Sequence, residues 1–503
     1  SPDYEPSLPV SEKSNPLTRD IDRASANGIR LLSKQVVETL MEVAKKVECI
    51  LKDPRDSVVV LSGCGTSGRL AFLITVCEGK KRVLFIGISC GLSAPFVAGQ
   101  LDLCLQHPEV YTPVLVGFNP THQARDESIP GCRFTFRSVV QRMQELTKSQ
   151  KAFIINPVVG PEAISGSSRM KGGSATKILL EVILSAAHAA TFTSTPITYK
   201  GILQYMRAYE KSLDVTFAQK EGISALLEAA GRSLQCGRRV CYLGWGSLAT
   251  LGLIDASECI PTFGADYNDV RGFISGGYRE LNNNEGPLVC ERKQWINIYD
   301  VSEVAKLARS VREKTSNLHA VCHRVDGDTA AAVQQEDINK LCLSSLKIPW
   351  SSPASGILAH LQWELSTKLL LNAVSTGAHV LKGKIYQNYM IDVQVTNSKL
   401  YCRATRLLQN LSGCPESQCE EALLKTIYRV DKLTADITPS DISTHTRTAR
   451  NRTKVRRLWG GPSGFGLFAD RLLSQGCRDS FGATANRKGG CRGVPVIIDM
   501  ASS

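Results

Sequence analysis

Residues 160–177 read GPEAISGSSRMKGGSATK, a loop rich in Gly, hydroxyls and cations. The apolar run before this loop, residues 152–155, predicts a buried strand, and the apolar residues 178–184 after it predict a helix. Backbone N–H groups and the positive end of the helix dipole make such a loop suited to binding an anion. The alternative is a flexible surface loop with solvated cations.

Two more loops follow predicted strands in the same way. Residues 62–69 (SGCGTSGR) come after the strand 57–61, and residues 87–98 come after the strand 81–87. Because the carboxyl ends of parallel strands meet at one edge of a sheet, we expect the three loops to converge on one crevice. The alternation of strands and helices predicts an α/β fold with a parallel sheet.

A dinucleotide site is the alternative use of the first of these two loops. Gly63, Gly65 and Gly68 match the spacing G-x-G-x-x-G. A nicotinamide site also needs an acidic residue at the end of the next strand, whereas the nearest acid, Glu78, precedes that strand. The two hydroxyls at the tip of the loop favour a single phosphate group instead.

The second half of the chain repeats the pattern. A predicted strand at 238–243 leads into the Gly-rich residues 244–252, which indicates a duplicated domain. Glu258 ends the helix that follows and is a candidate for binding a sugar hydroxyl or for acid–base chemistry; the alternative is a surface acid on a helix. Residues 358–410 look helical throughout, and Lys384 inside them is a candidate to aim a cation into a pocket, unless it belongs to a solvated face.

The formal net charge of +13 raises the possibility of nucleic-acid binding. Residues 441–503 contain 11 Lys and Arg against 4 Asp and Glu, so more than half of the excess lies in this tail. We therefore expect no nucleic-acid partner. We interpret the residues from about 437 onward as a disordered basic tail, because helical periodicity ends there.

Neither a metal site nor a membrane span is expected. The 17 cysteines are scattered without a Cys-x-x-Cys pair, which favours reduced thiols. His319 and His323 are four residues apart on a possible helix, but no third ligand lies nearby, so we interpret them as part of a solvated helix face. No apolar run approaches the length of a membrane-spanning helix.

Five segments resemble the sugar isomerase (SIS) proteins that bind sugar phosphates, and among these the glucokinase regulatory protein family. They are residues 62–69, 87–98, 160–174, 257–270 and 375–388. The same segments are similar to those of the N-acetylmuramic acid 6-phosphate etherases. The resemblance implies one sugar-phosphate site at the junction of two domains.

The resemblance also implies the fold: α/β, with two tandem SIS domains that are doubly wound parallel sheets flanked by helices, a C-terminal helical cap and a disordered basic tail. The expected boundaries are 1–46 for an N-terminal arm and helix start, 47–196 for the first SIS domain, 230–369 for the second, 370–436 for the cap and 437–503 for the tail. Both SIS domains are expected to be incomplete. Residues 76–81 join directly to the next strand, and a strand is missing between 285 and 301.

The residues that would bind the ligand are carried over from the same motifs. Loops of the first domain would cradle the phosphate, and the second domain and the cap would reach the sugar. The phosphate set comprises Thr66, Ser67, Ser89, Cys90 through its backbone, Gly91, Ser93, Ser168 and Arg169, and the sugar set comprises Glu258 and Lys384. The resemblance implies no catalytic residue, no metal and no cofactor.

The implied function is to bind and inhibit glucokinase, more strongly with fructose 6-phosphate and less with fructose 1-phosphate, in the nucleus and cytoplasm and without a membrane. The alternative is an etherase-type lyase acting on N-acetylmuramic acid 6-phosphate. That chemistry needs an acid and a base beside the substrate. The loop Glu that would act with Glu258 falls in a segment that this chain lacks, which favours a binding protein over an enzyme.

Overall fold

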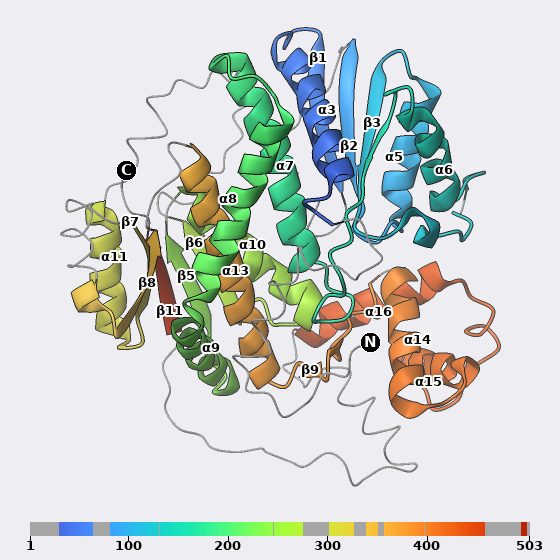
Figure 1. Ribbon diagram of the computed structural model, residues 1–503. Helices are drawn as coiled ribbons and strands as arrows, with labels where there is room; N and C mark the ends of the chain where they lie inside the picture. Colours follow the sequence, from blue (N-terminus) through green and yellow to red (C-terminus); the bar gives the residue numbers. More distant parts are fainter. Residues whose placement is uncertain are drawn as a thin grey trace.

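The computed structural model describes residues 30–63, 81–129, 131–244, 246–274, 301–325, 339–350, 357–396, 398–457 and 494–499. These residues form two α/β units, joined by long helices, and a group of helices that lies below the first unit (Figure 1). The positions of Thr66 and Ser67 lie outside the described residues.

The first unit is built on a parallel sheet with the order β1-β2-β3-β4. Its strands are β1 (Ser57–Gly63), β2 (Arg82–Ile88), β3 (Tyr111–Val116) and β4 (Phe153–Ile155). One face packs against α3 (Lys34–Leu51) and α7 (Lys171–Phe192), and the other packs against α5 (Pro95–Gln106) and α6 (Phe136–Thr147). The strands are apolar on both faces because helices cover both.

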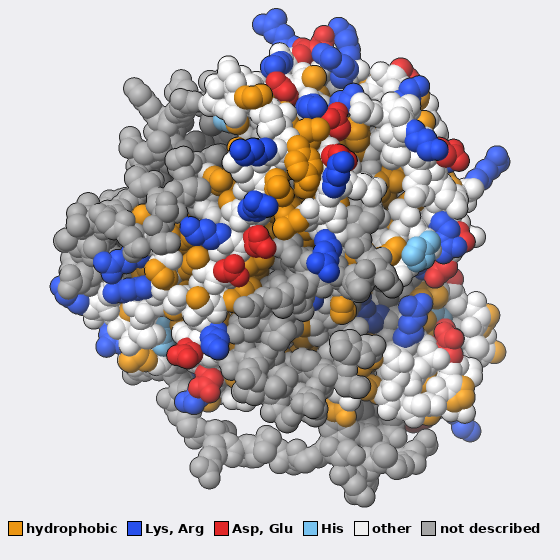
Figure 2. Space-filling model, viewed as in Figure 1, with side chains coloured by type: hydrophobic (Ala, Val, Ile, Leu, Met, Phe, Trp, Pro, Cys, Tyr) orange, Lys and Arg blue, Asp and Glu red, His pale blue; other side chains and the backbone are white. Residues whose placement is uncertain are grey.

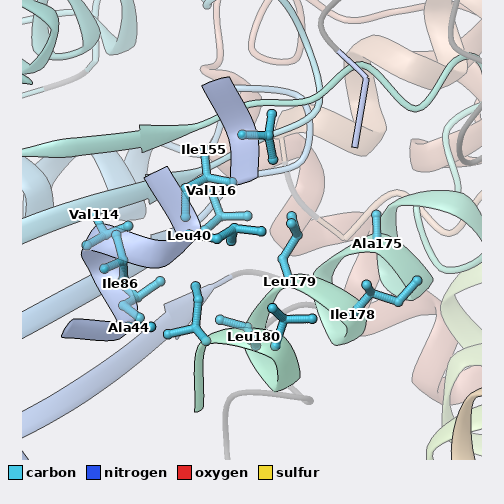
Figure 3. Packing of buried hydrophobic residues seen from close by; sticks show 14 of the residues in the cluster. Leu40, Ala44, Ile86, Val114, Val116, Ile155, Ala175, Ile178, Leu179 and Leu180 are labelled. Atoms are coloured by element: carbon cyan, nitrogen blue, oxygen red, sulfur yellow. The ribbon is translucent and has the colours of Figure 1, made fainter. Parts of the chain in front are cut away.

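The core between this sheet and its first pair of helices is continuous. In Figure 3, Leu40 and Ala44 of α3 lie against Ile86 and Val114 of the sheet, on the side where α7 also packs. The side chains of Leu40, Ala44, Ile86 and Val114 are fully buried. This packing fixes the start of α7, and with it the loop 160–170, relative to the ends of the strands.

Two helices, α8 (Tyr199–Phe217) and α9 (Lys220–Gln235), connect the first unit to the second. The second sheet is also parallel, with the order β6-β5-β11-β7-β8. Its strands are β5 (Val240–Gly244), β6 (Val270–Ile274), β7 (His319–Val325), β8 (Ser344–Trp350) and β11 (Val494–Asp499). The helices α10 (Gly246–Phe263), α11 (Val301–Lys314) and α13 (Ile357–Leu381) complete this unit, so the predicted pair of parallel α/β domains is confirmed.

The helices below the first unit begin after α13. A short hairpin of β9 (Ile385–Tyr386) and β10 (Tyr389–Met390) precedes α14 (Ser398–Ser412), α15 (Glu416–Tyr428) and α16 (Ile442–Arg457). The prediction of one helical stretch over 358–410 was therefore wrong at the hairpin. Gly383 adopts a φ of +78°, which ends α13 in the way that Gly commonly ends helices.

The prediction that residues 437–503 are disordered was wrong for α16 and β11. The helix α16 is polar and has no apolar stripe, so its periodicity is weak. It is held by His445, which stacks on the ring of Tyr401 and contacts the hydroxyl of Tyr428 at 3.0 Å. The backbone of β11 pairs with β5 on one side and β7 on the other.

The structure differs from two further predictions made from the sequence. His319 and His323 lie on the strand β7 rather than on a helix, and both are buried. The helix α7 is long and apolar enough to cross a membrane by length and composition alone, although no such run was expected. It is a core helix here, because it packs against α3 and α8 and more than half of its apolar window is buried in the protein.

Candidate functional site

The loop after β2 is shaped by Ser89. The Ser89 hydroxyl oxygen accepts hydrogen bonds from the backbone N–H groups of Ser93 (3.1 Å) and Ala94 (3.2 Å), directly before α5 begins. Leu92 completes the turn with a φ of 50° in the left-handed region. Ser89 is buried, whereas Gly91 is exposed and Ser93 is partly exposed. The turn thus presents a short stretch of backbone at the carboxyl end of the sheet.

The loop before α7 is capped by a carboxylate of its own. Glu162 accepts hydrogen bonds from the backbone N–H groups of Lys171 (3.0 Å) and Gly172 (2.8 Å). We expected free N–H groups at this helix N-terminus to face a ligand, and for these two residues that was wrong. Burial raises the pKa of the Glu162 carboxyl, while its two backbone hydrogen bonds oppose the rise.

The two loops meet at Gly172. A Cβ atom at this position would lie 3.3 Å from the Sγ of Cys90, 3.4 Å from the Cβ of Ser168 and 3.4 Å from the Oε1 of Glu162. Gly therefore allows this close approach, and it places Cys90 beside Ser168. Ser168 is exposed and lies next to the Ser89 turn. The predicted convergence is present for these two loops.

Arg169 points away from that surface and into the second domain. Its guanidinium donates to Oδ1 of Asp255 at 2.9 Å, to Ser375 at 2.6 Å and to Thr376 at 2.9 Å. It also lies over the ring of Phe263. Although burial disfavours the charged form, the Asp255 carboxylate holds the pKa of Arg169 above its usual value. The structure therefore gives Arg169 a role in joining the domains.

A second buried cation completes the junction. The ammonium group of Lys368 on α13 donates to the backbone oxygen of Arg169 at 2.9 Å, to Ser174 at 3.1 Å and to Asn372 at 2.8 Å. Burial lowers the pKa of Lys368 to about 8, although the nearby Glu258 carboxylate opposes this. Lys368 thus ties both the loop 160–170 and the start of α7 to the second domain.

Glu258 and Lys384 lie where the second unit and the segment after α13 approach this junction. The Glu258 side chain is buried, with Oε2 at 3.8 Å from the Nη1 of Arg169. Lys384 pairs with Asp392, beside the hairpin β9–β10. The hairpin contacts the loop directly, since the N–H of Ser165 donates to the oxygen of Asn388 at 2.7 Å. The described part of the chain holds no cluster of side chains suited to a metal ion.

Most of this network was not predicted from the sequence. Arg169 and Glu258 were candidate residues, but their neighbours Asp255, Lys368 and Asn372 were not. A signal was present, because α13 is an apolar helix interrupted by polar residues three or four positions apart, and such residues lie on one face. Those residues are Lys368, Asn372, Ser375, Thr376 and His379, and all are buried.

Family models match three parts of the chain. The N-terminal SIS domain of glucokinase regulatory protein matches residues 42–77 and 73–105, its second SIS domain matches 217–300 and 296–382, and its C-terminal lid domain matches 387–456. A glucokinase regulatory protein from Xenopus laevis is 41% identical over 90% of this chain and 88% of its own. The chain belongs to the glucokinase regulatory protein family. The human member is 37% identical over 90% of this chain and 88% of its own.

The comparisons also bear on the segments that the sequence led us to expect to be missing. The matches to both SIS models break, at residues 73–77 and at 296–300, close to where the sequence indicated missing segments. The alignment to the Xenopus laevis member spans 547 positions, more than this chain's 503 residues, so that relative contains segments that are absent here. The lid match ends inside α16, which is consistent with a helical lid that extends past residue 437.

The etherases are more distant relatives. The N-acetylmuramic acid 6-phosphate etherase of Erwinia tasmaniensis is 34% identical, but the aligned region covers only 41% of this chain and 71% of the etherase. The relatives that match over nearly the whole chain are named as regulatory proteins rather than as enzymes.

Proposed function

We propose that this protein binds and inhibits glucokinase, and that fructose 6-phosphate promotes the inhibition while fructose 1-phosphate relieves it. Glucokinase as the partner rests on the family, whose curated members carry that name. The two sugar phosphates rest on the resemblance of the loops. We further propose that the protein works in the nucleus and cytoplasm, and imaging of a tagged protein tests this localisation. We propose that it binds neither nucleic acid nor a membrane.

One structural relationship carries the proposal. Ser168 is exposed beside the Ser89 turn, and the next residue, Arg169, is buried in the second domain against Asp255. A ligand that binds Ser168 therefore touches a loop that is fixed to the domain junction. Since a ligand shifts a protein's conformation only through differential affinity for its states, such a connection suits a regulator.

The charge distribution does not favour nucleic acid as a partner. On the face seen in Figure 2, Lys and Arg side chains alternate with Asp and Glu and do not gather in one basic patch. This supports the view that this face of the protein does not bind a polyanion.

The test is inhibition of purified glucokinase by the full-length protein, with each sugar phosphate added in turn. We expect fructose 6-phosphate to strengthen inhibition and fructose 1-phosphate to weaken it. The Ser168→Ala variant should need several-fold more of either ligand, because one hydrogen bond to an anion is lost. Ser149→Ala, an exposed serine that precedes β4 and so lies at the end of that strand away from the loop, is the control. Inhibition that responds to neither ligand would contradict the proposal.

Ser168 is a better probe than Ser89. The Ser89 oxygen also accepts two backbone hydrogen bonds that shape its turn, so Ser89→Ala changes the loop as well as any ligand contact. We expect Ser89→Ala to weaken sugar-phosphate binding more than Ser168→Ala does, and to lower the melting temperature of the free protein, which Ser168→Ala should leave unchanged.

An etherase-type lyase is the second candidate, and the partial similarity to the etherases favours it. Glu258 is the carboxylate that would act as acid or base, and it lies buried beside Arg169 and Lys368. A nearby cation stabilises the carboxylate form, which opposes service as a general acid. Release of lactate from N-acetylmuramic acid 6-phosphate, lost in Glu258→Gln, would establish the lyase instead.

A further inference from the structure

The lid helix α14 brings an arginine onto the loop 160–170. A Cβ atom at Gly166 would lie 2.5 Å from the Cζ of Arg403, 2.7 Å from its Nη2 and 2.9 Å from its Nε. The guanidinium therefore rests on the backbone of Gly166, which has a φ of +84°. Glycine is needed here for two reasons. It tolerates this φ, and a side chain at this position would displace the guanidinium.

The charge of Arg403 is not matched within the described residues. No carboxylate there pairs with it, and no hydrogen bond joins it to any group among them. The side chain is half-buried, and burial lowers its pKa with no carboxylate to oppose the shift. Lys384 differs, because Asp392 neutralises it. A guanidinium has five N–H donors, and a partly buried one is stabilised by an anion.

The surroundings of Arg403 offer further donors. Ser165, Gly166 and Ser168 are all exposed, so the loop carries two exposed serines within two residues of the glycine on which the guanidinium rests. The lid is held against this loop by the hydrogen bond between Ser165 and Asn388 and by packing of Met390 against Ile164 and Met170. The position of Arg403 over the loop is thus set by the same contacts that dock the lid.

We propose that Arg403 binds the phosphate group of the sugar phosphate, together with the hydroxyls of Ser165 and Ser168. This inference rests on the proposed function and extends it to a residue of the lid. A planar guanidinium matches two oxygens of a phosphate at once, which a lysine does not. The bound phosphate would then contact both the first domain and α14, so that ligand binding fixes the lid in place.

The alternative is that the guanidinium only packs on the peptide plane of Gly166. The two explanations differ in what the Arg403→Met variant does, since Met keeps much of the stem and its packing but has no charge. The matched control is Arg406→Met, an exposed arginine one turn further along the same helix. Calorimetry with the full-length protein should use three ligands: fructose 6-phosphate, inorganic phosphate and unphosphorylated fructose.

We expect Arg403→Met to weaken the binding of fructose 6-phosphate and of inorganic phosphate by about tenfold or more, because a hydrogen bond from a charged group is lost. Any binding of fructose should stay unchanged. Arg406→Met should bind as the wild type does. The affinity of Arg403→Lys for the phosphate ligands should lie between those of Arg403→Met and the wild type, because lysine keeps the charge but cannot bind two phosphate oxygens at once. The melting temperature of the unliganded Arg403→Met protein should stay close to that of Arg406→Met.

Equal affinity of Arg403→Met and Arg406→Met for both phosphate ligands would overturn the inference while leaving the proposed function standing. If Arg403→Met does not fold, Arg403→Lys decides, and wild-type affinity in that variant overturns the bidentate contact. If the wild type binds neither phosphate ligand, the proposed function fails as well. Binding of inorganic phosphate that depends on Arg403, without binding of fructose 6-phosphate, would support the anion contact and reject the sugar.

Discussion

The Nη1 atom of Arg169 lies 2.9 Å from Oδ1 of Asp255, and the side chains of both residues are at most 2% exposed. The pair joins the loop 160–170 of the first domain to α10 of the second. Asp255 also accepts hydrogen bonds from Tyr242 at 3.0 Å and from Asn372 at 2.8 Å, so its charge is fully surrounded by donors. The domain junction is therefore polar and buried.

Removing one member of this pair should destabilise the protein strongly. We expect Arg169→Met to lower the free energy of unfolding by about 3–5 kcal/mol, because the Asp255 carboxylate would stay buried without its cation. Urea unfolding measures the loss. The control is Arg232→Met, which breaks an exposed pair with Glu228 and should change little. A loss no larger than that of the control would show that the buried pair does not stabilise the junction.

A second buried cluster should make stability depend on pH. Lys177 of α7 faces two carboxylates, Glu181 on the same helix and Glu364 of α13, and Tyr209 of α8 donates to Glu181 at 2.8 Å. His360 of α13 lies 3.3 Å from Glu364. Burial and the neighbouring Glu364 charge raise the pKa of Glu181 to about 7, although Lys177 opposes the rise.

A carboxyl whose folded pKa exceeds its unfolded value holds a proton that the unfolded chain has released. Between about pH 4.5 and pH 7 the folded state therefore binds more protons, and stability falls as the pH rises. We expect Glu181→Gln to remove this fall, so that it is more stable than the wild type by roughly 1–3 kcal/mol at pH 8 but not at pH 4.5. Urea unfolding at both pH values tests this, with the exposed Glu210→Gln as control. A difference between Glu181→Gln and wild type that is the same at both pH values would refute it.

The contact between α9 and α13 depends on a glycine. A Cβ atom at Gly377 would collide with the side chain of Leu227. We expect Gly377→Ala to lower the free energy of unfolding by about 1–3 kcal/mol through overpacking. Gly99→Ala is the matched control, because Gly99 also lies in a helix but a Cβ there meets nothing within 4 Å. It should gain up to about 1 kcal/mol from helix propensity. Equal effects of the two substitutions in thermal unfolding would contradict the proposed close packing.

Much of the fold was predictable from local pattern. The apolar runs that predicted strands near 57–61, 81–87 and 152–155 became β1, β2 and β4, since strands covered by helices on both faces are apolar throughout. The failures were elements with mixed polarity. The helix α16 has no apolar stripe, and the strand β7 carries two histidines that looked like a helix surface.

The candidate site divides in the same way. The sequence by itself determined that a hydroxyl-rich loop lies between a strand and a helix, because Gly, Ser and the flanking apolar runs act locally. Only the tertiary structure decided that Glu162 caps that helix, that Arg169 turns inward to Asp255 and that Arg403 reaches Gly166 from the lid. These contacts join residues far apart in the chain, and whether a charge faces solvent or a buried partner depends on how the two domains and the lid pack together.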